Sequence, residues 1–473
     1  MISWLQQRRA STPDHPCLRW KSKTYSYRDL ALLVRQYGNA LEKYLYKPGD
    51  RVLIVEKDPF EQMILILACQ LVGTIPVPLD PKLPVQSYRQ LAKTVAARLI
   101  ISCRPELLGG ESWGPLVIPS TRIQMDFTSS AGLLHVQQQG DWVAVILFTS
   151  GTTGTPKAVQ LTFDNLCASA AAWRERLQFQ PNDRYLLCLP LHHIGGLAIV
   201  ARALQFGFFL VLAPDAGSET MAGLLSAERV SLVSLVPTML RRLLAIKKFA
   251  FPESMRAIIV GGGPAEGLDL AKWAEQEYPV FLVYGMTETG SAIAGGWLKD
   301  WENKRSENTG DSLFIGSPFP SVELRIRNDE IQVRGPVVMK GYWGEPDVSD
   351  WFSTGDLGRI DNEGFLNILM RRQDRIVTGG ENVNPQALER ILMEHPAIKE
   401  AVILGVPDAE WGQIVVAFVE TAEVDSVFSA TLLDWCRRRV PGYMIPKQVV
   451  STSEFPRTAL GKIDRERLLS LLS

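Results

Sequence analysis

The sequence predicts an α/β protein with a large N-terminal domain of parallel sheets flanked by helices and a small α+β C-terminal domain. Apolar runs typical of buried strands alternate with amphipathic stretches typical of helices over most of the chain. Polar or glycine-rich residues follow several of the apolar runs, as expected where ligands lie at the carboxyl ends of parallel strands. The chain has 473 residues, of which 46% are hydrophobic, so it can build more than one core.

The first part of the chain carries the clearest alternation. Helices are predicted for residues 26–41, 59–72 and 162–177. Strands are predicted for residues 50–55, 75–79 and 143–148. Residues 105–140 are polar and irregular, which predicts a surface excursion. A glycine-rich loop is predicted between the last of these strands and the last of these helices.

The alternation resumes in the second part. Strands are predicted for residues 184–189, 208–212, 230–236, 257–260 and 280–283. From Asp374 onward the chain reads as a separate unit of about a hundred residues, an ordinary size for a domain. We therefore predict an N-terminal domain over residues 1–373 and a C-terminal domain over residues 374–473.

Composition and charge exclude several classes of protein. The formal net charge is −1 and the basic residues are scattered, so we expect no nucleic-acid partner. The six cysteines show no CxxC pair and no metal-ligand spacing, which predicts free thiols in a reducing compartment. The N-terminal residues lack a signal-peptide pattern, and the most apolar stretch, residues 63–79, is interrupted by polar and helix-breaking residues. A cytoplasmic protein without a membrane span is expected, and the sequence leaves its oligomeric state open.

One glycine-rich segment carries the strongest sign of function. It consists of Thr149, Ser150, Gly151, Thr152, Thr153, Gly154, Thr155, Pro156 and Lys157. Glycines let backbone N–H groups approach an anion, hydroxyls add donors, and the lysine adds a mobile positive charge, so the segment suits phosphate. It is not a Walker A loop, because Ala158 stands where that motif has serine or threonine. A solvated loop is the alternative.

A second segment, residues 284–289, follows the strand predicted at 280–283. Tyr284 can stack on an adenine ring, and Thr287 can donate a hydrogen bond to a phosphate. Glu288 supplies a hard oxygen ligand of the kind that Mg²⁺ prefers. The same Thr-Glu-Thr run could instead form a helix cap.

Two further segments follow predicted strands, and a third carries an aspartate after a turn. His192 and His193 stand before a double glycine, which favours a pocket over two surface histidines. The triple glycine at residues 261–263 lets a flat ring lie against the backbone, although a tight turn is an equal alternative. Asp356 follows a Thr-Gly pair, and its carboxylate can accept both hydroxyls of a ribose.

Together these segments resemble the signature motifs of the adenylate-forming superfamily, which includes acyl-CoA synthetases, luciferases and the adenylation domains of peptide synthetases. The resemblance covers nearly the whole chain, with the motifs in family order. The chain departs from the family pattern at Ala158, where glycine is usual, and at His192, where an aromatic residue is usual. The resemblance implies two half-reactions. In the first, ATP with Mg²⁺ and a carboxylate give an acyl-adenylate and pyrophosphate, and in the second a thiol such as coenzyme A takes the acyl group.

The resemblance also assigns roles to single residues. The nucleotide site that it implies consists of Thr149, Ser150, Gly151, Thr152, Thr153, Lys157, Gly261, Gly262, Gly263, Tyr284, Asp356 and Arg372. Within it Asp356 holds the ribose, and an alternative register puts Arg371 in place of Arg372. Outside this set, Glu288 holds the metal. The residues implied in catalysis are His193, Thr287, Glu288 and Lys462.

By the same resemblance the C-terminal domain is mobile. It rotates about the hinge residue Asp374 between the two half-reactions. Lys462 bridges the substrate carboxylate and an ATP phosphate in the first half-reaction. The rotation then replaces Lys462 with Gly379 and Gly380, which open the path for coenzyme A.

Within the superfamily, the motif wording and the short chain resemble above all the o-succinylbenzoate–CoA ligases of menaquinone and phylloquinone synthesis. The acyl site that this implies consists of His193, Arg202, Gly263, Gly285 and Ser291. Arg202 lies in an apolar run, where a lone buried guanidinium is costly unless an anion pairs with it, and o-succinylbenzoate carries two carboxylates. A snorkelling or salt-bridged arginine is an equal alternative.

Three other interpretations stay open. An aryl or medium-chain acid–CoA ligase is expected if the acyl pocket holds no buried cation. A stand-alone adenylation protein would load a carrier supplied in trans. An inactive acyl-adenylate-binding protein is disfavoured, because residues suited to chemistry occur together at Lys157, Glu288, Asp356 and Lys462.

Overall fold

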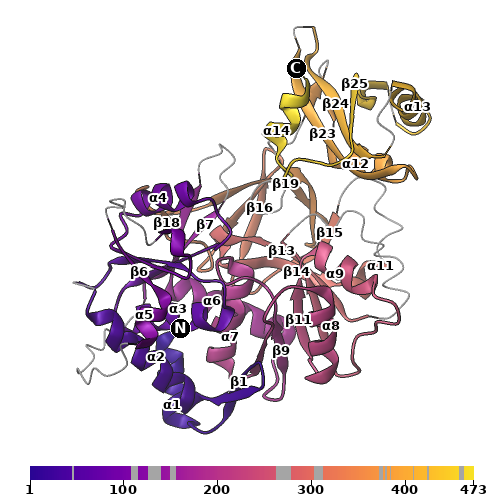
Figure 1. Cartoon of the computed structure of the whole chain (residues 1–473). Helices are drawn as coiled ribbons and strands as arrows, with labels where there is room; N and C mark the ends of the chain where they lie inside the picture. Colours follow the sequence, from indigo (N-terminus) through magenta and orange to yellow (C-terminus); the bar gives the residue numbers. More distant parts are fainter. Residues whose placement is uncertain are drawn as a thin grey trace.

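The structure is a computed structural model of the chain. It describes residues 1–44, 47–107, 115–125, 140–149, 156–262, 278–302, 313–371, 376–378, 381–383, 385–408, 410–422, 426–440, 442–457 and 463–472. Over these residues strands and helices alternate, which confirms the predicted α/β class (Figure 1). The chain begins with α1 (Ile2–Ser11), which is followed by the strand pair β1 (Pro16–Trp20) and β2 (Lys23–Ser26).

A small parallel sheet is built by the first α/β units. Its strands are β3 (Arg51–Val55), β4 (Ile75–Leu79), β5 (Leu99–Ser102) and β6 (Leu116–Pro119), in the order β4-β3-β5-β6. The helices of this region are α2 (Tyr27–Glu42), α3 (Pro59–Leu71), α4 (Val85–Thr94) and α5 (Ser120–Met125). The prediction of an irregular excursion over 105–140 is wrong in its described part, because β6 extends the sheet and α5 follows. Both elements are too short to give a clear periodic pattern.

Local sequence explains where the first helices begin. Ser26 and Asp29 form a capping box at the start of α2, in which each side chain accepts a hydrogen bond from the other residue's backbone N–H. Asp58 caps α3, and Pro59 occupies its first turn. Nearly every residue of α3 is buried, which explains why its sequence is apolar on all faces.

The large sheet carries the remaining predicted strands. Its parallel part runs in the order β13-β12-β11-β9-β10-β1. The new strands are β9 (Arg184–Leu187), β10 (Phe209–Leu212), β11 (Leu232–Leu235), β12 (Ala257–Val260) and β13 (Val280–Met286). The helices are α6 (Phe163–Leu177), α7 (Ile194–Phe206), α8 (Ser218–Ala227) and α9 (Pro237–Leu244). The last three each connect one parallel strand to the next, as such connections require, and they lie beside the sheet in Figure 1.

Beyond β13 this sheet is antiparallel, so the large sheet is mixed. It continues from β13 through β14 (Ser291–Trp297), β15 (Leu313–Pro318), β20 (Leu366–Arg371), β19 (Phe352–Ile360), β17 (Glu330–Arg334) and β16 (Glu323–Arg327). The short helix α11 (Leu298–Glu302) follows β14. Asp356 therefore lies within a strand, β19, although the sequence places it after a turn.

A three-stranded sheet holds both ends of the phosphate segment. β7 (Val143–Thr149) pairs with β8 (Lys157–Thr162), which pairs in turn with β18 (Gly341–Tyr342), and both pairs are antiparallel. The predicted loop between a strand and a helix is thus wrong, because the glycine-rich segment joins two strands. The polar residues of β8 hide its strand character in the sequence. Thr149 and Lys157 become direct partners across β7 and β8.

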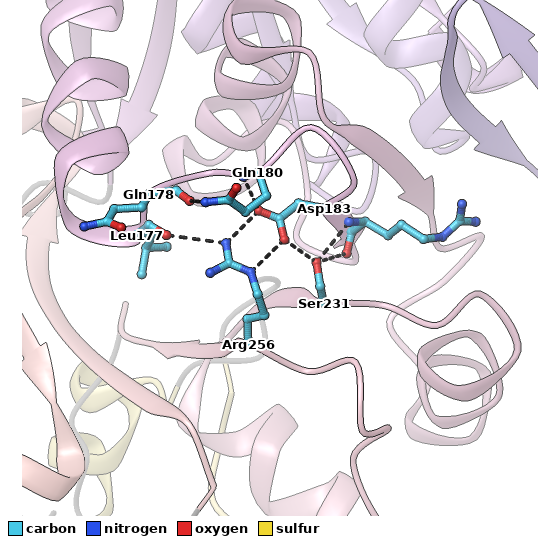
Figure 2. A network of polar contacts seen from close by, with 7 residues as sticks. Leu177, Gln178, Gln180, Asp183, Ser231 and Arg256 are labelled. Atoms are coloured by element: carbon cyan, nitrogen blue, oxygen red, sulfur yellow. Dashed lines mark hydrogen bonds and ion pairs between the residues drawn. The ribbon is translucent and has the colours of Figure 1, made fainter.

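A buried polar network fixes the edge of the sheet at which the parallel strands begin (Figure 2). The Asp183 carboxylate accepts two hydrogen bonds from the Arg256 guanidinium, at 2.9 and 2.7 Å, and one from the Ser231 hydroxyl at 2.8 Å. Arg256 also donates to the Leu177 carbonyl at the end of α6. These residues stand just before β9, β11 and β12, so the network ties three neighbouring strands together. It leaves the carboxyl ends of those strands for the functional residues.

Residues after 375 form a sheet of their own. Its strands are β21 (Ile376–Thr378), β22 (Glu381–Val383), β23 (Ile398–Asp408), β24 (Gly412–Thr421) and β25 (Gln448–Thr452). The helices are α12 (Pro385–Met393), α13 (Ser426–Arg437) and α14 (Arg465–Leu469). Two apolar clusters in this part draw residues from it alone. The predicted boundary at residues 373 and 374 lies outside the described residues and stays a prediction.

The cysteines match the prediction of free thiols. All six are unpaired with one another in the structure. Burial raises the pKa of Cys69 and of Cys188 to about 12, so these thiols stay protonated and are poor nucleophiles. In the described part of the chain, no single helix is both long enough and apolar enough to cross a bilayer.

Candidate active site

A tight hairpin between β13 and β14 presents the predicted metal ligand. The short 3-10 turn Thr287–Thr289 connects the two strands. Gly285 is required here, because a Cβ on it would lie 2.0 Å from the Ser291 carbonyl oxygen. The buried Thr289 hydroxyl lies 3.1 Å from the Met286 nitrogen and 2.8 Å from the Ser291 carbonyl, so it closes the turn from inside. The turn thus holds the Glu288 side chain at the carboxyl end of β13.

Glu288 is surrounded by residues from three separate parts of the chain. The Thr149 hydroxyl donates to Glu288 Oε1 at 3.4 Å, and the Tyr342 hydroxyl donates to the same oxygen at 3.1 Å. The backbone carbonyl of Glu288 accepts from the Met339 N–H at 2.8 Å. Lys157 Nζ lies 4.6 Å from the centre of the Tyr342 ring. The structure therefore brings the predicted metal ligand next to both ends of the phosphate segment.

The predicted adenine and ribose ligands are in contact. The Tyr284 hydroxyl donates to Asp356 Oδ2 at 2.7 Å, and both side chains are largely buried. The turn before Asp356 is held by Glu330, whose carboxylate accepts from the Gly355 N–H at 2.9 Å. The Thr354 hydroxyl donates to the Ile331 carbonyl and accepts from the Asp356 N–H. Asp356 is therefore positioned by its own strand and by β17.

The glycine turn after β12 lies beside this pair. β12 and β13 are parallel neighbours, with Val260 opposite Leu282. A Cβ on Gly261 would lie 2.4 Å from Val283 Cγ2, so the turn packs closely on the strand that carries Tyr284. A flat ring could approach this turn without meeting a side chain from Gly261 or Gly262.

The two predicted pocket histidines differ in their surroundings. His193 stands at the N-cap of α7 with its side chain exposed, whereas His192 is half-buried. Their rings lie 4.5 Å apart. Burial lowers the pKa of His192 to about 3, with smaller contributions from His193 and Lys82. His192 is therefore neutral near pH 7, like the aromatic residue that the family pattern has there.

A test of the His192 environment is the acid dependence of stability. The folded pKa is below the ordinary 6.5, so between these values the unfolded chain binds the proton and the folded chain does not. The stability that this contributes is present above pH 6.5 and is lost as the pH falls. Urea unfolding at pH 7 and pH 5 is expected to show that wild type loses about 2 kcal/mol more than His192→Phe. His15→Phe, at an exposed histidine, should lose as much as wild type, and equal losses in all three proteins would contradict the assignment.

Arg202 is buried in the body of α7, with 2% of its surface exposed. Nε donates to the Ala198 carbonyl at 2.9 Å, and the guanidinium carbon lies 4.4 Å from the centre of the Trp173 ring. Its NH1 atom has no hydrogen-bond partner among the described residues. Burial lowers the pKa of Arg202. Neither snorkelling nor an ion pair with a described carboxylate accounts for this residue.

Ser291 begins β14 and is 9% exposed, with a φ of 135°. This is a strained conformation for a residue other than glycine, and strain of this kind gathers at functional sites. Thr287 opens the turn beside Glu288 and is half-buried. Ser150, Gly151, Thr152, Thr153, Gly263, Arg372, Asp374, Gly379, Gly380 and Lys462 lie outside the described residues. Arg371 is described only in its backbone, which pairs with Asp356 across β19 and β20.

The site fits Mg²⁺ that is shared with a nucleotide. Among the described residues no group of three or more histidine, cysteine or carboxylate side chains could hold a metal by itself. Mg²⁺ commonly binds one or two carboxylates and completes its shell with water and substrate phosphates. A single carboxylate, Glu288, next to a lysine and a threonine of the phosphate segment matches that mode. When bound there, the ion would supply charge neutralisation to the phosphates.

The sequence interpretation missed Tyr342 and Glu330. Tyr342 belongs to an aromatic pair between two glycines, which is the only local signal that it carries. Its contact with Glu288 depends on the pairing of β18 with β8, and these strands lie far apart in the sequence. Glu330 reads as a surface residue of a short charged run, yet it is 9% exposed because β17 pairs with β19.

The chain matches two protein families in succession. The family of AMP-binding enzymes matches residues 5–343, and the C-terminal domain of AMP-binding enzymes matches residues 387–462. A 2-succinylbenzoate–CoA ligase from Bacillus velezensis is 34% identical, over 99% of this chain and 98% of the relative.

Solved structures of o-succinylbenzoate CoA synthetase from Bacillus subtilis are also similar. The complex with the acyl-adenylate intermediate aligns with a TM-score of 0.89 and 31% identity, over 98% of this chain and 97% of that one. The complex with ATP and magnesium ion aligns with a TM-score of 0.88 and 31% identity, over 98% of this chain and 99% of that one. The predicted architecture therefore occurs in solved structures that hold ATP and magnesium ion or an acyl-adenylate.

Proposed function

We propose that this chain, which belongs to the family of AMP-binding enzymes, is an AMP-forming acid–thiol ligase that converts 2-succinylbenzoate to its coenzyme A thioester. In this proposal it serves menaquinone or phylloquinone synthesis, and the free thiols agree with a cytosolic location. The observation that carries the nucleotide part is the grouping of Thr149 and Lys157 around Glu288, which directly follows β13, the strand whose Tyr284 contacts Asp356. The acid is proposed from the relatives, which act on 2-succinylbenzoate by name.

The first half-reaction joins an oxygen of the substrate carboxylate to the α-phosphorus of ATP. The bond from that phosphorus to the oxygen that bridges it to the β-phosphorus breaks, and pyrophosphate leaves with that oxygen. The chain needs no nucleophile for this step, because positioning and charge neutralisation suffice. Asp356 and Tyr284 hold the nucleoside, Lys157 and Thr149 hold the phosphates, and Glu288 would hold Mg²⁺. Thr287 donates to the α-phosphate in this proposal.

The second half-reaction transfers the acyl group. The coenzyme A sulfur attacks the acyl carbonyl carbon, AMP leaves with the carboxylate oxygen that it gained, and the thiol proton goes to solvent. We assign the approach of coenzyme A to Gly379 and Gly380, and the exchange with Lys462 to rotation about Asp374. The acyl group lies near His193, with Gly263, Gly285 and Ser291 along its path.

Arg202 supports the choice of a dicarboxylate. A guanidinium without a described anionic partner can receive the second carboxylate of 2-succinylbenzoate, which a monocarboxylic acid lacks. The contact with Trp173 favours a second candidate, in which Arg202 only packs and the acid is an aryl or medium-chain monocarboxylate.

Pyrophosphate release from ATP and Mg²⁺ separates the candidates. The panel contains 2-succinylbenzoate, benzoate, 4-phenylbutyrate and octanoate, each with and without coenzyme A. We expect strong pyrophosphate release with 2-succinylbenzoate and with no other acid of the panel. Strong release with a monocarboxylate instead would keep the ligase and exclude the proposed acid, whereas no release with any acid would favour a carrier-dependent or inactive protein.

A further inference from the structure

We propose that Tyr342 is a positioning residue that joins the metal-binding carboxylate to the lysine of the phosphate segment. Its hydroxyl orients Glu288 and its ring holds Lys157, so that Mg²⁺ and the nucleotide phosphates meet a preorganised unit. This inference rests on the proposed function, because it concerns the binding of Mg²⁺ and ATP in the same site. It does not depend on which acid is activated.

The hydroxyls of Tyr342 and Thr149 both contact the same oxygen of the Glu288 carboxylate. Its hydroxyl lies 3.1 Å from Oε1, and the Thr149 hydroxyl reaches the same oxygen at 3.4 Å. Within the described part of the chain no hydrogen bond reaches Oε2. Two hydroxyls on Oε1 therefore restrain that oxygen and leave Oε2 available to a metal.

The ring of Tyr342 keeps two opposite charges apart. Lys157 Nζ sits 4.6 Å from the ring centre, and the described contacts include no ion pair between Lys157 and Glu288. A direct ion pair would use up the positive charge meant for phosphate and the negative charge meant for Mg²⁺. An aromatic face attracts an ammonium group without neutralising it, so both charges remain for their ligands.

The backbone around Tyr342 is anchored to both partners. β18 pairs with β8, the strand that begins at Lys157. The Trp343 N–H donates to the Ala158 carbonyl at 2.8 Å, and the Met339 N–H donates to the Glu288 carbonyl at 2.8 Å. The backbone that follows Tyr342 is thus hydrogen-bonded to the strand of the lysine. The backbone that precedes Tyr342 is hydrogen-bonded to the metal ligand. Such support holds a site at productive geometry.

Two substitutions separate the hydroxyl from the ring. Tyr342→Phe removes the donor and keeps the aromatic face, whereas Tyr342→Leu removes both. Tyr37→Phe is the matched control, because the Tyr37 hydroxyl also donates to a glutamate, Glu61, at 2.8 Å. Affinity for ATP is measured by titration calorimetry on the full chain, with Mg²⁺ and with EDTA, in the absence of acid and coenzyme A.

We expect Tyr342→Phe to bind ATP about tenfold more weakly than wild type in Mg²⁺, as for the loss of a group that orients a metal ligand. Its affinity in EDTA should be unchanged. Tyr342→Leu should in addition lose a factor of about two to five in EDTA, the size of a lost cation–π contact. Tyr37→Phe should match wild type in both conditions.

Other results would overturn the inference. If Tyr342→Phe bound ATP in Mg²⁺ as tightly as wild type, or more tightly, the hydroxyl would not orient Glu288. If Tyr342→Leu kept its affinity in EDTA, the ring would not hold Lys157. If Tyr37→Phe also bound ATP more weakly than wild type, general destabilisation would explain the effects. Wild type that binds ATP with Mg²⁺ but makes no thioester from 2-succinylbenzoate would contradict the proposed acid alone, and wild type that binds no ATP would contradict both proposals.

Discussion

Replacing Glu288 with glutamine is expected to slow acyl-adenylate formation by a factor of about 10² to 10³, the usual cost of losing one preorganised electrostatic group in a site. Glutamine keeps the shape of the side chain and can still accept from Tyr342, so the fold should be preserved. It removes the negative charge that would hold Mg²⁺ against the phosphates. Pyrophosphate release at saturating acid and ATP measures the loss, and raising the Mg²⁺ concentration should recover part of it.

Glu61→Gln provides the control for this substitution. Glu61 also accepts a tyrosine hydroxyl, from Tyr37, but lies on α3 away from the phosphate segment. The control should keep the wild-type rate at every Mg²⁺ concentration. A Glu288→Gln variant that retained the wild-type rate would show that another group binds the metal.

The second large effect is expected at Arg202. Arg202→Met should lower kcat/KM for 2-succinylbenzoate by about 100-fold, because truncating one partner of a buried charge pair leaves the other unpaired. The loss should lie mainly in KM, since the second carboxylate binds equally in ground state and transition state. Methionine should pack against Trp173 in place of the guanidinium and should not lower the melting temperature of the free protein.

A parallel measurement with 4-phenylbutyrate distinguishes binding from packing. This monocarboxylate lacks the second charge, so its kcat/KM should be unchanged or higher in Arg202→Met. Equal losses for both acids, together with a lower melting temperature, would mean that Arg202 supports the fold through Trp173 and Ala198. An unchanged KM for 2-succinylbenzoate would contradict the anion-binding role.

Much of the fold follows from local patterns in the sequence. The parallel strands from β9 to β13 are short apolar runs with polar or glycine-rich ends, and their positions are confirmed by the structure. The capping residues Ser26 and Asp29 mark the start of α2 in the sequence. These features depend on a few neighbouring residues, which is why one sequence suffices to locate them.

The features that sequence interpretation missed depend on long-range pairing. β8 reads as part of a loop because its strand character comes from β7 on one side and β18 on the other. Asp356 reads as a turn residue, yet β19 pairs with both β17 and β20 around it. Tyr342 has no local pattern that links it to Glu288. Pairings between distant segments leave no periodic trace in either segment alone.

The candidate site shows the same difference between local and long-range features. Chemistry-bearing residue types such as Glu288, Lys157 and Asp356 are visible in the sequence as motifs. Their mutual placement is not, since it follows from the β13–β14 hairpin and from β18. The functions of Lys462, Asp374, Gly379 and Gly380 stay predictions, because these residues lie outside the described part of the chain.

The most direct test of the central claim is the product balance of one reaction. The purified chain is incubated with ATP, Mg²⁺, coenzyme A and 2-succinylbenzoate, and the products are separated by liquid chromatography with mass detection. We expect one 2-succinylbenzoyl-CoA for each AMP and each pyrophosphate, the stoichiometry of the proposed ligase. Formation of ADP and phosphate, or of AMP without the thioester when coenzyme A is in excess, would contradict it.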